Sequence, residues 1–278
     1  FTWLSCRHCK SWCAGYSPHI AGGMGKSMAC TREQLNAFLD TLLRPEQFQD
    51  YCPNGLQVEG RAEIEHLVTG VTASEALLVA ARERNADAVL VHHGYFWRSE
   101  DPRITGMKAT RLRTLMQADM SLFAYHLPLD CHPECGNNVL LGKLMGIETP
   151  EPLDADNVGS PLFRGQLSTP TDLQTLGQCL EKALGRKPLL IGEGLVQSVA
   201  WCTGAGQGYI DQAADADADV YVTGEVSEQT VHIARERGIA FIAAGHHATE
   251  RYGVQAVGEL ASQTLGFSHE FVDIDNPV

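Results

Sequence analysis

Length, composition and charge already exclude several kinds of protein. The 278 residues, 44% hydrophobic and 20% charged, are typical of a globular protein large enough for two ordinary domains. Because 34 acidic residues outnumber 21 basic ones, the formal charge of −13 makes nucleic acid an unfavourable partner, and no apolar run approaches the roughly 20 residues that cross a bilayer. The nine cysteines are odd in number and scattered, which favours reduced thiols and predicts a cytoplasmic location.

Residues 1–29 differ from the rest of the chain. They lack any helical or strand period, and they contain Cys6, His8, Cys9 and Cys13. We predict that this N-terminal extension is disordered, or was added upstream of a natural start at Met24 or Met28. The alternative is a small metal site built on the Cys-x2-Cys spacing.

Residues 30–148 alternate strand and helix patterns and are expected to form a first α/β half. Thr31 and Gln34 resemble a capping box, which predicts an amphipathic helix over 32–43. Residues 50–59 are rich in turn formers and are expected to form a loop. The other predicted elements are strands 66–71, 88–91 and 121–125 and helices 75–84, 107–118 and 137–145.

Residues 149–160 are predicted to be a linker, because they contain proline, glycine and acidic residues without an apolar period. Residues 161–278 are then expected to form a second α/β half. Its predicted strands are 196–203, 219–223, 239–244 and 270–274, and its predicted helices are 172–184, 209–216, 228–237 and a long helix that ends at Leu265.

A weak internal repeat relates the two halves. Thr69-Gly70 matches Thr203-Gly204, and residues 86–89 match residues 218–221. Each copy then runs through a helix and a strand to a histidine with a carboxylate four residues later. These pairs are His126 with Asp130 and His246 with Glu250, while His93 of the first copy falls on Glu225 of the second. We therefore predict an α/β fold of two duplicated halves that face a shared site.

Histidines and carboxylates gather at the ends of predicted strands, where open α/β sheets bind their ligands. Successive strand residues point to opposite faces, so His92 and His93 are better placed to serve two ions than one. Residues four apart share one face of a helix, so His246 and Glu250 can reach the same ion or ion pair. Imidazole and carboxylate ligands suit two divalent ions such as zinc, iron, manganese or nickel. Cys131 and Cys135 are expected to be bystanders.

Two loops add further candidates. The glycine-rich turn 202–208 can offer backbone N–H groups to an anion, or can be a tight turn packed on the sheet. Glu225 follows a predicted strand and is a candidate catalytic residue, either as a general base or as a partner that orients a ligand histidine.

Six motifs, in order, resemble those of the GTP cyclohydrolase I type 2-like family, also called the Nif-three-like family. They are residues 53–60, 68–74, 91–97, 126–130, 224–228 and 245–251, and the resemblance covers about 31–278. It implies a Nif-three-like fold, a dinuclear metal site between the halves and a homohexamer whose sites open into a central cavity. It also implies five metal ligands, with His126 and His247 nearby but not ligands, although spacing alone does not exclude these two histidines. The implied ligands are His92, His93, Asp130, His246 and Glu250.

The function that this reading predicts is metal-dependent hydrolysis. A water activated by the two ions would attack an electrophilic carbon of a nucleotide-like substrate, with GTP cyclohydrolase activity as the specific version. A non-catalytic metal-binding or regulatory scaffold is a second possibility, and its metal site would be closed. A protein linked to DNA or nucleotide repair is a third, which would need a basic channel that the net charge disfavours.

Overall fold

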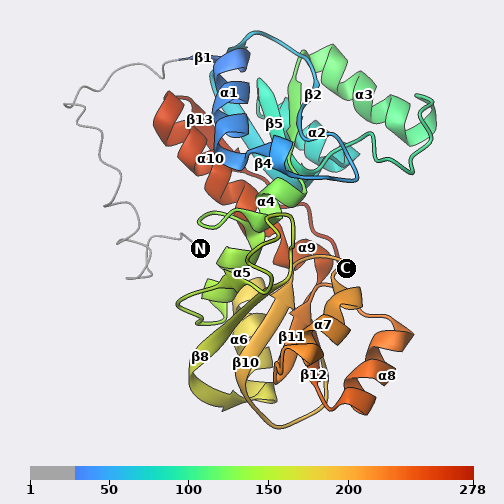
Figure 1. Cartoon of the computed structure of the whole chain (residues 1–278). Helices are drawn as coiled ribbons and strands as arrows, with labels where there is room; N and C mark the ends of the chain where they lie inside the picture. Colours follow the sequence, from blue (N-terminus) through green and yellow to red (C-terminus); the bar gives the residue numbers. More distant parts are fainter. Residues whose placement is uncertain (1–28) are drawn as a thin grey trace, which may run out of the picture.

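Two mixed β-sheets organise residues 29–278, which are the residues that the computed structural model describes. Each sheet carries its own helices, so that the chain forms an upper and a lower α/β half (Figure 1). The predicted α/β class is therefore confirmed. The predictions for the N-terminal extension and its cysteines lie outside the described residues. No helix in the described part of the chain is long and apolar enough to span a membrane.

The first sheet has the strand order β13-β4-β5-β6-β2. Strands β4, β5 and β6 are parallel, β13 adds parallel to β4, and β2 adds antiparallel to β6. Its strands are β2 (Gly55–Val58), β4 (His66–Thr72), β5 (Ala88–His93), β6 (Ser121–Ala124) and β13 (Ser268–Phe271). The helices and small elements around it are β1 (Cys30–Thr31), β3 (Glu63–Ile64), α1 (Arg32–Leu43), α2 (Glu75–Glu83), α3 (Gly106–Ala118) and α4 (Leu127–Cys131). Helix α5 (Asn137–Leu144) instead packs its Leu141 into the core of the second sheet.

The second sheet has the strand order β7-β8-β10-β11-β12-β9. Strands β10, β11 and β12 are parallel, and the outer strands are antiparallel to their neighbours. Its strands are β7 (Glu151–Pro152), β8 (Phe163–Asp172), β9 (Leu189–Ile191), β10 (Leu195–Cys202), β11 (Val220–Thr223) and β12 (Ala240–Ala243). The helices of the rest of the chain are α6 (Leu173–Leu184), α7 (Ile210–Asp215), α8 (Glu228–Arg237), α9 (His246–Thr249) and α10 (Arg251–Leu265).

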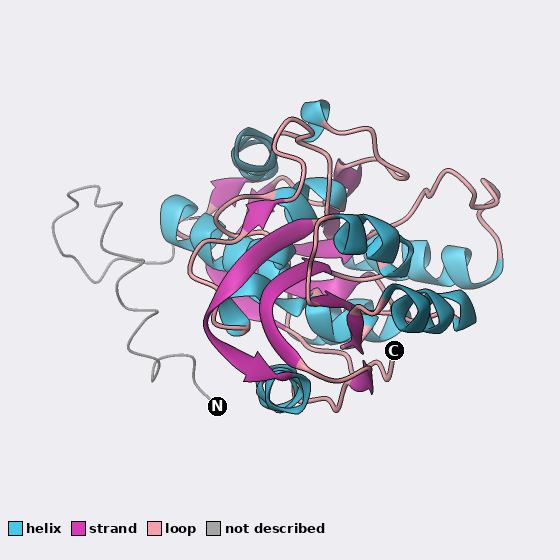
Figure 2. Cartoon of the chain, turned by 60° about the horizontal axis from the view of Figure 1, so that its bottom comes forward, coloured by secondary structure: helices cyan, strands magenta, loops and turns pink. Residues whose placement is uncertain are grey.

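The central parallel strands of both sheets are buried on both faces, as parallel strands usually are. In the first sheet, Val89 packs with α2 and α3 on one face, and Leu90 packs with α1 and α10 on the other. In the second sheet, Val222 packs with α6 on one face, and Tyr221 packs with α7 and α8 on the other. Helices accordingly lie on both sides of the strands (Figure 2).

Local signals placed several elements correctly. Thr31 Oγ1 accepts a hydrogen bond from the Gln34 backbone N–H at 3.1 Å, and the Thr31 N–H donates to Gln34 Oε1 at 2.8 Å. This confirms the capping box, and α1 and α8 have the predicted bounds. Such elements are predictable because their caps and apolar period lie within one segment.

Other predictions were wrong where pairing with distant strands decides the structure. The predicted loop 50–59 contains β2, the linker 149–160 contains β7, and neither β8 nor β9 was predicted. The second half also does not extend to residue 278. Helix α10 packs on α1 and β4, and β13 pairs with β4, so the C-terminal segment (red in Figure 1) returns to the first half.

One hydrogen-bond pattern occurs in both halves and supports the predicted duplication, which stays a prediction. Asp87 precedes β5 and Asp219 precedes β11, the middle strands of the two parallel triplets. Each carboxylate accepts two backbone N–H groups from the start of the neighbouring strand. Asp87 Oδ2 accepts from Glu65 and His66 at 2.8 and 2.9 Å, and Asp219 Oδ2 accepts from Gln197 and Ser198 at 2.8 Å each.

Candidate metal centre

The five predicted ligands lie together at the junction of the two halves. Strand β5 supplies His92 and His93, α4 supplies Asp130, and α9 begins with His246. Glu250 lies at the break between α9 and α10, so the predicted long helix is two helices. Helices α4 and α9 lie between the upper and lower lobes (Figure 1).

The five side chains divide into two groups that share one carboxylate. His92, Asp130 and Glu250 form one group, and His93, His246 and Glu250 form the other; within each group the ligand atoms lie within 4.8 Å of one another. Glu250 Oε1 lies 3.5 Å from His92 Nε2. Glu250 Oε2 lies 3.4 Å from His93 Nε2 and 3.2 Å from His246 Nε2. One carboxylate thus offers one oxygen to each group.

The two adjacent histidines fall into the two different groups that share Glu250, and together with His126 they also form a third possible group. Alternation along a strand would place His92 and His93 on opposite faces. Instead, their ring centroids are 4.5 Å apart and the rings are tilted by 45°. His93 is the last residue of β5. The two rings therefore lie side by side in the same centre.

Each of the three imidazoles is oriented through its Nδ1 atom. His92 Nδ1 donates to the Tyr125 carbonyl at 3.0 Å, and His93 Nδ1 lies 3.1 Å from Thr72 Oγ1. His246 Nδ1 donates to Glu225 Oε1 at 2.7 Å. These contacts leave Nε2 directed to the centre, which is how proteins orient histidine ligands. The position of Glu225 supports its role as the partner of His246.

Buried polar atoms without partners also indicate that the site can bind a cation. His92 Nε2 and Glu250 Oε2 are buried and have no hydrogen-bond partner within residues 29–278. A buried polar atom without a partner costs about 1–3 kcal/mol, and cations bound between these atoms would remove that cost. The donors are imidazole nitrogens and carboxylate oxygens, a set that suits divalent ions. Cys131 and Cys135 belong to none of the candidate groups in the described part of the chain.

His126 and His247 have different surroundings. The His126 ring lies 5.0 Å from the His92 ring, and its Nδ1 donates to Asp50 Oδ1 at 2.7 Å. His247 Nε2 lies 2.8 Å from Asp273 Oδ1, so this side chain is held away from the shared carboxylate by the C-terminal segment. Asp50 is a site residue that the sequence reasoning missed. Its position at the head of the motif-bearing loop 50–59 was the available signal.

The glycine-rich loop after β10 is a tight turn. The N–H groups of Thr203, Gly204 and Gly206 donate to side chains of the protein, at 3.0 to 3.1 Å. They are therefore not directed at an anion. Gly204 has φ +65°, and a Cβ atom there would lie 2.0 Å from Glu250 Oε1. The loop packs directly against the shared carboxylate, and only glycine fits.

The carboxylates change the pKa values of the histidines. Burial alone lowers the pKa of His92, but the charges of Asp130 and Glu250 outweigh burial and raise it to about 9. Burial also opposes the proton on His246, yet Glu250 and Glu225 raise its pKa to about 9. For His93 burial prevails, supported by the neighbouring imidazoles, and lowers the pKa to about 3. The carboxylates thus favour protons on His92 and His246 in the metal-free protein.

These values predict how pH affects the metal-free protein. His92 and His246 bind protons more tightly when folded, so their stabilising contribution is complete below about pH 6.5 and is lost as pH rises through about 9. His93 has the opposite effect below pH 6.5: its pKa is lower in the folded protein, so unfolding lets it take up a proton and the folded state loses stability as the pH falls. We expect the melting temperature of chelator-treated protein to fall by several degrees between pH 6.5 and 9. Metal ions need neutral imidazoles, so metal-loaded protein should not show this fall.

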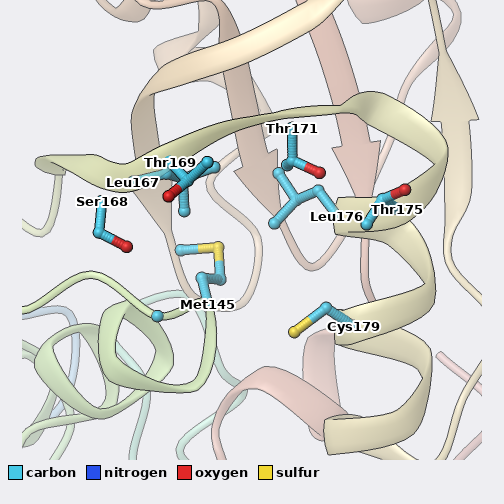
Figure 3. Close-up of a pocket in the computed structure, with 9 residues that line it drawn as sticks. Met145, Leu167, Ser168, Thr169, Thr171, Thr175, Leu176 and Cys179 are labelled. Carbon is cyan, nitrogen blue, oxygen red and sulfur yellow. The ribbon is translucent and has the colours of Figure 1, made fainter.

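Two cavities differ in their relation to this centre. One, of about 130 Å³, is lined by His93 and His246 together with Val71, Thr72, His247, Asn276 and Val278. The other, of about 210 Å³, lies between β8 and α6 in the second half (Figure 3). Its lining consists of hydroxyl and apolar side chains and Cys179, without a charged group, so it offers nothing to the chemistry of the centre.

Residues 30–277 match the family model Duf34/NIF3 (NGG1p interacting factor 3). The chain belongs to this family. A curated relative, "GTP cyclohydrolase 1 type 2 homolog" of Pseudomonas aeruginosa, is 55% identical over 251 residues, which are 90% of this chain and 100% of that protein. The resemblance inferred from the six motifs is thereby confirmed.

Solved structures of similar proteins agree with the fold. The structure of "protein ybgI, unknown function" is 47% identical, with a TM-score of 0.85, and the match covers 90% of this chain and 100% of that one. The structure of TTHA1606 from Thermus thermophilus is 36% identical, with a TM-score of 0.82 and the same coverage. The Nif-three-like fold predicted from the sequence is therefore confirmed, whereas these names assign no reaction.

Proposed function

We propose that this Duf34/NIF3 protein is a dinuclear metal-dependent hydrolase of a nucleotide-like small molecule, similar to a type 2 GTP cyclohydrolase. The observation that carries the proposal is Glu250, whose two oxygens reach two different groups of candidate ligands. In this proposal His92, Asp130 and Glu250 hold one divalent ion, and His93, His246 and Glu250 hold the other. Zinc, iron, manganese and nickel all suit these donors.

Two such ions would activate a water molecule and bind the oxygens of a substrate. The protein's own residues hold the ligands in place for this task. Asn137 Nδ2 and Thr203 Oγ1 donate to Asp130 Oδ1 at 2.9 and 3.1 Å. Glu225 fixes the ring of His246, and in this proposal it acts as an orienting partner rather than as a general base.

The exposed fractions of the candidate ligand side chains favour an enzyme over a non-catalytic scaffold that only holds metal. A structural metal site is closed, whereas a catalytic site keeps an open position. His92 and Glu250 are buried, but the side chains of His93 and His246 are 17% and 26% exposed. The second ion would therefore lie on the open side of the centre, where a substrate can reach it. The nucleotide-like substrate itself comes from the names of relatives such as that of P. aeruginosa.

An assay with GTP and other nucleotides tests this function. We expect wild-type protein loaded with each metal in turn to release formate or phosphate, and His92→Ala to lose at least 100-fold in rate because one ion loses its buried ligand. His232→Ala, on the exposed surface of α8, is the matched control and should keep full activity. Absence of any product from wild-type protein with every metal would contradict the hydrolase proposal, even if two ions bind.

The homohexamer and the cytoplasmic location belong to the same proposal. A hexamer with sites open to a central cavity would give a particle of six 30.3-kDa chains. Sedimentation of the purified protein measures that mass directly.

A further inference from the structure

A polar pair, Asp50 and His126, lies outside the two groups that share Glu250, although His126 also forms possible metal-ligand groups with His92 and His93 and with Asp50 and Cys52. Asp50 accepts four hydrogen bonds: from the N–H groups of Tyr51 and Leu127 at 2.6 and 2.9 Å, from Asn54 Nδ2 at 3.0 Å and from His126 Nδ1 at 2.7 Å. Both of its oxygens are thus occupied, so this buried carboxylate is an anchor rather than a metal ligand. Its effect is to fix the ring of His126.

The fixed ring lies beside the centre, because one ring nitrogen of His126 lies within 4.8 Å of ring nitrogens of His92 and His93. The His126 ring lies 5.0 Å from that of His92 and 5.8 Å from that of His93. Its side chain is 16% exposed, whereas that of His92 is fully buried. The hydrogen bond to Asp50 uses Nδ1, which leaves Nε2 as the other ring nitrogen of His126. This nitrogen can therefore bond to a molecule that reaches the centre from outside.

Aromatic side chains surround this imidazole. The Trp97 ring meets the His126 ring edge-on at 5.0 Å and lies 5.9 Å from His93, and Tyr51 meets His126 edge-on at 6.5 Å. Tyr51 is nevertheless 61% exposed, which is unusual for a large aromatic residue beside a buried site. One exposed aromatic side chain, Tyr51, and one half-buried side chain, Trp97, thus border the centre.

The backbone holds these two aromatic residues in place. The Arg98 N–H donates to the Tyr51 carbonyl at 2.7 Å, and its guanidinium donates to the Asp50 carbonyl at 2.9 Å, so the two loops are joined. Phe96, next to Trp97, has φ +66°, a conformation that costs energy in residues other than glycine. Such strain persists where surrounding contacts fix the backbone, and it is frequent at ligand sites.

We propose that His126, Tyr51 and Trp97 form a subsite for a planar heterocyclic ring of the purine type. The ring lies against Tyr51 and Trp97, its polar edge bonds to His126 Nε2, and its electrophilic carbon faces the ions. This inference rests on the proposed function and deepens it. The cavity of about 130 Å³ beside His93 and His246 is smaller than the roughly 300 Å³ of usual ligand sites, so the proposal places the ring against the loops that carry Tyr51 and Trp97.

Binding measurements on metal-loaded protein test the subsite without any turnover. Guanosine carries the ring without a phosphate, and ribose 5-phosphate carries the remainder without the ring. We expect guanosine to bind, and Tyr51→Leu and Trp97→Leu each to raise its Kd about tenfold, the loss of one base–aromatic stack. Binding of ribose 5-phosphate and the metal content should not change. Leu195→Ala, at an exposed position of β10 in the second half, is the matched control.

His126→Gln tests whether His126 binds the heterocyclic ring or a metal ion. The proposal expects unchanged metal content with weaker guanosine binding, and Asp50→Asn should reproduce that effect because it releases the ring. Loss of an ion in His126→Gln, or guanosine binding that is absent or equal in all variants, overturns the subsite. If the aromatic variants weaken guanosine binding but wild-type protein hydrolyses no nucleotide, the hydrolase proposal fails and the subsite stands.

Discussion

A Glu250→Ala chain should lose both ions, whereas an Asp130→Ala chain should keep one. Glu250 offers an oxygen to each ligand group, but Asp130 belongs only to the group of His92. After dialysis against metal-free buffer we expect about two ions per chain in wild-type protein, about one in Asp130→Ala and almost none in Glu250→Ala. Mass spectrometry of the metal content measures all three.

Two controls separate the loss of a ligand from the loss of the fold. Glu250→Gln keeps the shape of the buried side chain and should also lack both ions while melting cooperatively. Glu228→Ala changes an exposed carboxylate at the start of α8 and should retain both ions. One ion left in Glu250→Ala, or two left in Asp130→Ala, would contradict the shared-carboxylate arrangement.

A single methyl group at Gly204 should also disable the centre. In Gly204→Ala the new Cβ atom would lie 2.0 Å from Glu250 Oε1 and 3.1 Å from His246 Nε2, so the carboxylate would have to move. The left-handed backbone adds about 1–2 kcal/mol of destabilisation for any residue with a side chain. We expect metal affinity, measured by competition with a chelator, to fall about 10–100-fold, with a lower melting temperature.

Gly208→Ala is the matched control for this prediction, because it lies in the same loop and its added Cβ atom would meet nothing within 4 Å. It should bind metal as wild-type protein does. Equal metal affinity in the two variants would show that contact between the loop and Glu250 does not position the carboxylate.

The sequence located the site because its signals are local. His92-His93 ends an apolar run, and His246 and Glu250 are four residues apart at the start of a helix. These candidate ligands can therefore be recognised from residue type and spacing alone, without knowledge of any long-range contact. Strands β8 and β9 carried no such signal. β8 is mostly exposed and contains Pro170, and its place is set by pairing with β10. β9 has only three residues and is set by pairing with β12.

The sequence by itself thus determined the fold class and the main helices, and its resemblance to the family implied the five candidate ligands. Only the tertiary structure decided that Glu250 lies between two ligand groups and that Asp50 fixes His126 beside them. It also decided that α10 and β13 return to the first sheet. The physical reason is the same in each case. These contacts join segments far apart along the chain, and their distances depend on how the two sheets and their helices pack together.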